Sequence, residues 1–298
     1  MSGDHRAFLA GLPVAVRADL VRTADAPGIR QAAGHLGAIL ALGALIAAGV
    51  SGWWLLLLPQ GVLIVFLFCA MHEASHRTVF ATRWMNDALA WVAGVLLVLP
   101  PEWFRAFHFA HHRFTQDPAR DPELASPKPE TRGALIWHCT GLPLWWGSLR
   151  VLLRNALRGA PEDFVPPRLA GRMRREARAM LALYALLAAG SLAAGSAALV
   201  WVWIVPALMG QPFLRVYLLA EHGRCAFVAD MFENSRTTLA GWLVRRLAWN
   251  MPFHAEHHAF PAVPFHRLPD LHALAAPHLK VTSPGYPAFA LETWEAAR

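Results

Sequence analysis

Cysteine and charged residues are scarce in this chain. Its 298 residues include three cysteines, Cys69, Cys139 and Cys225, and no CxxC pair. This pattern excludes a disulfide framework and the thiolate set of an iron–sulfur cluster. Charged residues make up only 16% of the chain and hydrophobic residues 56%. Soluble proteins usually contain about 45–50% apolar residues, so this composition indicates a membrane protein.

Four long apolar stretches carry almost no charge. They cover about residues 32–50, 53–71, 179–198 and 200–220, and only a short turn separates the members of each pair. Each stretch is close to the roughly 20 residues that an α-helix needs to cross a bilayer. We therefore expect an all-α integral membrane protein with four transmembrane helices in two hairpins. Two further apolar segments, 88–100 and 134–153, favour helices that lie in the membrane interface.

Lys and Arg are unevenly distributed along the chain. Fifteen of the 27 lie between residues 72 and 178, and neither hairpin turn contains one. By the positive-inside rule, segments 1–31, 72–178 and 221–298 are cytoplasmic and form a cap on a single membrane domain. The net charge of +7 then comes from Lys and Arg residues that set the orientation of the membrane helices and contact anionic lipid. Nucleic-acid binding is not expected, because the chain has no basic soluble domain.

Histidine is concentrated in three clusters, HEASH at 72–76, HFAHH at 108–112 and HAEHH at 254–258. Spacings of three and four residues place these side chains on one helix face, and His222 directly follows the fourth span. Imidazole is a common ligand of iron, copper and zinc. Nine histidines exceed what one ion can use, which favours two ions, with iron first and copper second. The candidate ligands are His72, His76, His108, His111, His112, His222, His254, His257 and His258.

Polar residues adjoin the candidate ligands. They are Glu73, Glu221, Asn250 and Glu256, with Asp117 and Asp121 after the second cluster. A side chain next to a ligand points away from the ligand face, so we expect the glutamates to accept imidazole N–H bonds and orient the rings. Asn250 suits either a supporting or water-mediated contact with the site or a hydrogen bond at a helix end. The two aspartates suit either ring support or turns before proline.

The three clusters, together with the two hydrophobic hairpins, resemble the membrane fatty acid desaturase and hydroxylase superfamily over about residues 35–290. The stretches HHRFTQDPARDPEL and HAEHHAFPAVPFHRLPDLH are similar to those of bacterial members. The resemblance implies a non-haem di-iron centre, held by the nine histidines, that uses O2 to abstract hydrogen from an unactivated C–H bond. It favours desaturation of a fatty acyl chain in a bacterial inner membrane. Hydroxylation of a lipid, carotenoid or small aliphatic substrate is the alternative.

Two other classes of protein share single features of this sequence. HEASH matches the HExxH signature of zinc hydrolases, with Glu73 as general base, but an intramembrane protease would leave the other clusters unexplained. Metal transporters usually place polar residues near mid-bilayer, whereas these histidines lie at the ends of the spans. Because the chain has no haem domain or cysteine cluster of its own, we expect an external ferredoxin- or rubredoxin-type electron donor at the basic cytoplasmic face.

Overall fold

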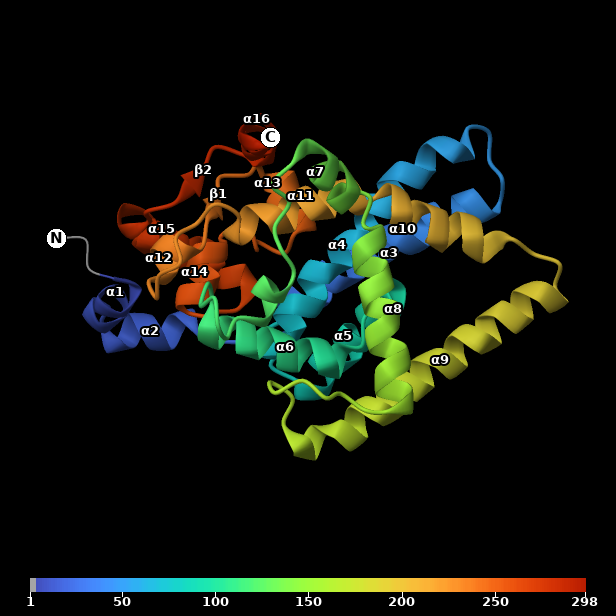
Figure 1. The fold of residues 1–298 in the computed structure, drawn as a ribbon, viewed down its shortest axis with the longest axis horizontal. Coiled ribbons are helices and arrows are strands. Elements are labelled where there is room, and N and C mark those ends of the chain that lie inside the picture. The colour runs from blue at the N-terminus through green and yellow to red at the C-terminus, as the bar shows by residue number, and fades with distance from the viewer. Residues whose placement is uncertain (1–3) are drawn as a thin grey trace.

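Helices make up almost all of the regular structure of residues 4–298, the part of the chain that the computed structural model describes (Figure 1). The helices before residue 160 are α1 His5–Gly11, α2 Val14–Leu20, α3 Asp25–Ala47, η1 Trp53–Leu56, α4 Leu57–His76, α5 Arg83–Leu97, α6 Pro101–Phe114, η2 Pro122–Ala125, α7 Arg132–Cys139 and α8 Leu142–Leu157. Those after it are η3 Pro167–Leu169, α9 Ala170–Ala193, η4 Val200–Ile204, α10 Val205–Met209, α11 Gln211–His222, α12 Met231–Asn234, α13 Trp242–Leu247, α14 His254–Ala259, η5 Phe265–Arg267, α15 Leu268–Ala275, η6 Ala276–His278 and α16 Tyr286–Ala296. The two-residue strands β1 Thr237–Thr238 and β2 Thr282–Ser283 pair in parallel.

Three helical segments are long and apolar enough to cross a membrane: Val14–Ala47, Trp53–His76 and Pro167–Ala193. Two bent pairs are further candidates. One joins α5 to α6 through a bend of 101°, and the other joins η4–α10 to α11 through a bend of 41°. The prediction of a helical protein with membrane-spanning segments is confirmed at this level, with three to five candidate spans.

Several of the expected segments have different limits in the structure, and the segment expected at 134–153 forms two helices, α7 and α8. α9 begins at Ala170, although the sequence predicts a span over 179–198. Its first turns are rich in arginine, which lowers hydropathy but favours a helix. The segment expected at 88–100 forms α5, which ends before Val98, a residue with a left-handed backbone (φ 57°). The pair Pro100–Pro101 follows, and Pro101 starts α6 at a position that suits proline.

The C-terminal elements lie beside the N-terminal helices, as the red and dark-blue ribbons in Figure 1 show. Asp230, the N-cap of α12, accepts a hydrogen bond of 2.9 Å from the His5 backbone amide. Further along the chain, Gln31 of α3 donates to the carbonyl of Arg246 at the end of α13. These contacts join segments more than 200 residues apart, so the chain closes around the end of α4.

Two glycines allow α4 and α10 to cross closely. A Cβ atom built on Gly61 would lie 1.9 Å from the carbonyl oxygen of Pro206. One built on Gly210 would lie 2.4 Å from the carbonyl oxygen of Gly61. Small residues at such crossings let two backbones come into contact, which is a major source of stability between membrane helices.

Replacing Gly61 with alanine should therefore destabilise the protein. We expect a loss of about 1–3 kcal/mol, because the added methyl group would push backbones apart. The measurement is thermal unfolding in detergent. Gly190→Ala on α9 is the control, since a Cβ there would meet nothing within 4 Å. Equal melting temperatures for the Gly61→Ala variant and the wild type would contradict the proposed packing role.

Candidate metal centre

α4 carries the first pair of histidines to the centre of the structure. His72 and His76 lie one helical turn apart in its last two turns, so both rings point to the same side. The helix ends there because Arg77 adopts a left-handed backbone (φ 61°) and its amide bonds to the carbonyl of Ala74. The apolar body of α4 thus places two imidazoles at the end of a mostly buried helix.

α6 and α14 supply histidines in adjacent pairs, His111–His112 and His257–His258. Successive residues on an α-helix are about 100° apart, since one turn takes 3.6 residues. The two rings of each pair therefore point in different directions. In the structure His112 and His257 join one group of histidines, whereas His111 and His258 join another. Each pair of neighbours bridges the two groups.

The first group contains five histidines whose ligand nitrogens all lie within 4.8 Å of one another. The Nε2 atoms of His76 and His108 are 2.7 Å apart. As whole residues, His76 and His112 are partly exposed, and the other three histidines are buried. The members are His72, His76, His108, His112 and His257.

The second group contains His111, His222 and His258, with ligand nitrogens that also lie within 4.8 Å of one another. All three side chains are buried. The Nε2 atom of His222 is 3.1 Å from that of His111 and 2.9 Å from that of His254. His254 therefore lies at the edge of this group. The two groups contain eight of the nine histidines that the sequence predicts as ligands, and His254, the ninth, lies beside the second group.

The nitrogens of these rings suit a bound cation. Among residues 4–298, no protein atom hydrogen-bonds to either ring nitrogen of His72, His112 or His257. Burial lowers the pKa of His254, His257 and His258 well below the usual range, and the neighbouring histidines lower it further. The rings of α14 are therefore neutral and carry free lone pairs. A buried polar atom without a hydrogen-bond partner costs about 1–3 kcal/mol. A cation that binds the lone pairs removes this cost, so two metal ions, one for each group, fit this arrangement.

Contacts with the outer nitrogens orient the rings of the second group. The Nδ1 atom of His111 lies 3.0 Å from Asp121 Oδ1, and that of His222 lies 3.1 Å from the carbonyl oxygen of Asn234. Thr115 contacts the Nδ1 atom of His258 at 3.1 Å. With Nδ1 engaged, the Nε2 atoms point inward, as is common for metal-binding histidines.

The four polar residues predicted to support the site have different contacts. Glu221 Oε1 lies 3.2 Å from His254 Nδ1, but the two groups are not aligned for a hydrogen bond. Glu73 instead accepts from the Thr78 hydroxyl and the Phe265 amide. Glu256 accepts from the Thr237 hydroxyl and pairs with His272. The Asn250 amide donates to the carbonyl of Phe265 at 3.0 Å.

Glu73 and Glu256 thus contact residues other than the nine histidines, which differs from the contacts expected from the sequence. Asn250 follows the end of α13, where its backbone amide donates to the carbonyl of Arg245, in agreement with the helix-end alternative. Glu73 and Asn250 both bind the backbone of Phe265, which ties the end of α4 to the segment after the third histidine cluster. Because Glu73 and Asn250 are separated from Phe265 in the sequence, no local pattern predicts these two contacts.

Two residues in the loop after α6 contact the second group without having been predicted from the sequence. Thr115 contacts His258, and the Gln116 amide donates to the carbonyl of His222. Asp121 and Asp117 were both expected to support a ring or to form a turn. Asp121 contacts His111, whereas Asp117 accepts from Ala119 and Arg120 and forms a turn. The sequence signal that could have identified these loop residues is their polar character within ten positions of HFAHH.

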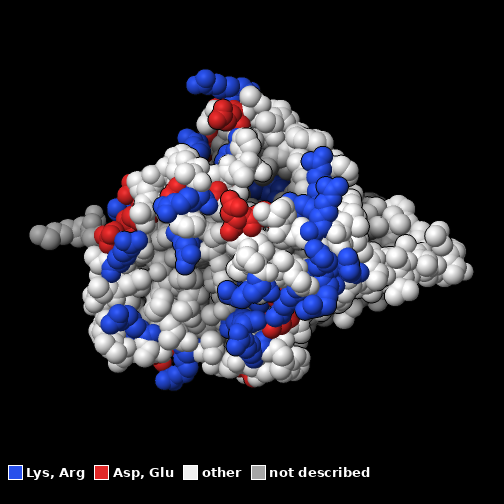
Figure 2. Space-filling model, turned by 60° about the horizontal axis from the view of Figure 1, so that its bottom comes forward, with Lys and Arg blue, Asp and Glu red and all other residues white. Residues whose placement is uncertain are grey.

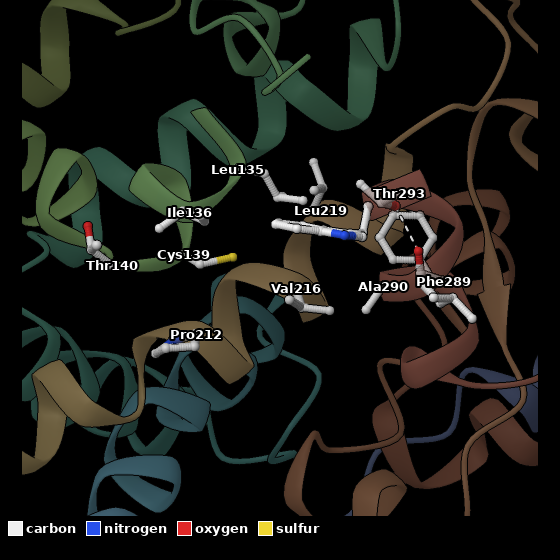
Figure 3. Close-up of a pocket in the computed structure, with 12 residues that line it drawn as sticks. Leu135, Ile136, Cys139, Thr140, Pro212, Val216, Leu219, Phe289, Ala290 and Thr293 are labelled. Carbon is white, nitrogen blue, oxygen red and sulfur yellow. Dashed lines mark hydrogen bonds between the residues drawn. The ribbon is translucent and has the colours of Figure 1, made fainter. Parts of the chain in front are cut away.

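An apolar groove of about 650 Å³ lies between α7, α11 and α16. Figure 3 shows Leu135 of α7, Val216 and Leu219 of α11, and Phe289 of α16 around it. Val216 and Leu219 are three residues apart, and His222 follows after three more. The groove therefore runs along α11 toward the end that carries His222.

Comparison with known proteins gives the chain a family. The family described as fatty acid desaturase matches residues 20–289. The chain belongs to this family. It is 24% identical over 243 residues to a sn-1 oleoyl-lipid 12-desaturase of Picosynechococcus, covering 72% of this chain and 67% of that protein. It is 26% identical over 262 residues to a sphingolipid delta(4)-desaturase of Drosophila melanogaster, covering 84% and 75%.

A second sn-1 oleoyl-lipid 12-desaturase, from Synechocystis, is 24% identical over 269 residues, covering 83% of this chain and 71% of that protein. Family membership confirms the prediction of an oxidoreductase that desaturates lipids, and favours it over the hydroxylase alternative. Such enzymes generally depend on two irons, and the two histidine groups of this desaturase could bind them.

Proposed function

We propose that this desaturase introduces a double bond into the acyl chain of a membrane lipid at a di-iron centre held by the nine histidines. The observation that carries this proposal is the pair of converging histidine groups with unpartnered ring nitrogens. The relatives named above act, by their names, on oleoyl lipids and sphingolipids. When bound, the irons supply O2-dependent removal of hydrogen from an unactivated C–H bond. The protein supplies the ligand geometry and excludes water by burial.

The proposed topology has four spans: α3, α4, α9 and the η4–α10–α11 pair. We assign α5 and α6 to the cytoplasmic interface, because a bend of 101° sets the two helices nearly perpendicular to each other. This arrangement keeps all nine histidines on one side of a bacterial inner membrane. It forms one domain, in which residues 1–31, 72–178 and 221–298 make up the cytoplasmic cap.

Lipid analysis of cells that express the chain tests the proposed reaction. In a host with a simple lipid profile, we expect acyl chains that have lost two hydrogens, and purified protein with about two irons per chain. His108→Ala should abolish desaturation and lower the iron content, since His108 belongs to the first group. A gain of one oxygen atom in the lipid would instead support the hydroxylase. One zinc per chain without any lipid oxidation would contradict the proposal.

We further propose that the groove along α11 holds part of the acyl chain. Its lining is apolar, and the family acts on lipids. Leu219 and His222 lie one helical turn apart, about 4.5 Å along the axis at 1.5 Å per residue. A chain in this groove would therefore lead toward the second histidine group.

Val216→Trp should fill the groove and reduce desaturation. We expect a drop of about tenfold or more in kcat/KM, corresponding to a misplaced substrate, with unchanged iron content. Leu192→Trp is the matched control, because Leu192 lies on α9 with 83% of its surface exposed. The proposal fails if the two variants keep the same kcat/KM and the same preference for acyl chain length.

The electron donor that we propose is an acidic ferredoxin- or rubredoxin-type protein. Figure 2 shows Lys and Arg side chains gathered on one face of the molecule. Exposed arginines are frequent on α8, η3 and the first half of α9, and we call them the basic patch. Its members are Arg150, Arg158, Arg168, Arg172, Arg174, Arg175 and Arg178. Charges of one sign on such a face speed the approach of an oppositely charged partner.

Reversal of charge in the basic patch should slow turnover driven by such a donor. For Arg174→Glu combined with Arg175→Glu, we expect kcat/KM for the donor to fall about tenfold at low salt, and less at high salt because salt screens the charges. Arg6→Glu, at an exposed arginine outside the patch, is the control. A rate that does not depend on salt in the wild type would rule out electrostatic docking here.

A further inference from the structure

A carboxylate lies at the edge of the second histidine group. Glu123, in the short helix η2, has its Oε2 atom 3.5 Å from the Nε2 atom of His111. This nitrogen is the one that faces the group, because Asp121 occupies the Nδ1 atom of the same ring. The carboxylate and the inward nitrogen of His111 therefore face the same space.

The distance between these two atoms suits two ligands of one ion better than a hydrogen bond. A charged N–H···O bond is usually about 2.7–2.9 Å long, and a contact of 3.5 Å is too long to count as a strong one. Nitrogen and oxygen ligands lie about 2.1 Å from a first-row metal, so neighbouring ligands are about 3–3.5 Å apart. The observed separation falls at the upper end of this range.

The two groups also differ in the number of nitrogens they offer. The first group has five histidines, whereas the second has three, with His254 at its edge. Iron combines readily with imidazole and carboxylate ligands in one site. With His254 included, an oxygen from Glu123 would bring the second group to five ligands, the same number as in the first.

The surrounding contacts hold Glu123 in place. The side chain of Asp121 caps η2 by accepting from the Glu123 amide at 2.9 Å, and the same carboxylate contacts His111. Lys128 pairs with Glu123 Oε1. One oxygen is thus engaged on the outer side, while Oε2 is the atom turned toward His111.

We propose that Glu123 supplies a carboxylate oxygen as a ligand to the metal ion of the second group. This inference rests on the metal centre proposed above. The ligand makes the two ions inequivalent, since only the second has an anionic protein ligand. It also leaves a partly exposed carboxylate, with 30% of the side chain accessible, as the solvent-facing edge of the site.

Iron binding and Mössbauer spectroscopy of the full-length protein in detergent test the proposal. We expect Glu123→Gln to bind the second iron at least about tenfold more weakly, and the spectrum to lose or shift one of two iron signals. Lys128→Gln, which removes the ion pair but keeps the carboxylate, should retain both irons and both signals. A similar loss in the two variants would show that the ion pair matters and would overturn the proposal.

Chemical rescue separates a lost ligand from a damaged fold. In Glu123→Ala, added acetate should restore the second iron and its spectroscopic signal, because a free carboxylate can take the vacated position. Failure of acetate to restore either one would overturn the proposal. Two irons with an unchanged spectrum in Glu123→Gln would do the same. A wild type without two irons would instead refute the metal centre itself, so the two failures are distinguishable.

Discussion

The convergence of imidazole lone pairs in a buried space is the constraint on which this structure depends. Nine histidines point their nitrogens at two small regions, and several of these nitrogens have no hydrogen-bond partner among residues 4–298. Buried groups of this kind are stable only when something binds them, and a cation satisfies many lone pairs at once. Metal binding at the proposed centre would therefore be coupled to the folding of this region. The apolar helices fix the ends from which the rings project.

The two histidine groups are supported in different ways. In the second group, Asp121, Asn234 and Thr115 contact the outer ring nitrogens. In the first group, His72, His112 and His257 are held by packing against one another. Hydrogen-bonded rings keep one tautomer and one direction, whereas packed rings can tilt. The two partly exposed histidines, His76 and His112, both belong to the first group, so the two groups differ in residue exposure as well as in support.

The helical membrane architecture could be predicted because it depends on local sequence. Uncharged stretches near twenty residues long read directly as helices that can span a bilayer. The predicted limits of the helices were less accurate where a helix contains charged residues, as at the arginine-rich start of α9. The bend between α5 and α6 follows from Pro100 and Pro101, but its angle of 101° depends on how α6 packs. Supporting contacts such as that of Asn250 with Phe265 join residues whose pairing no local pattern reveals.

The sequence by itself determined the family, the membrane helices and the nine candidate ligands, because hydropathy and histidine spacing act over a few residues. Only the tertiary structure decided how these histidines divide into two groups. The neighbours His111 and His112 separate because a helix turns by about 100° per residue and other helices approach from different sides. The same holds for Glu123, which reaches His111 only because the loop after α6 folds back over the site. Both arrangements exist only in the folded chain, because helix packing and the path of this loop place the atoms.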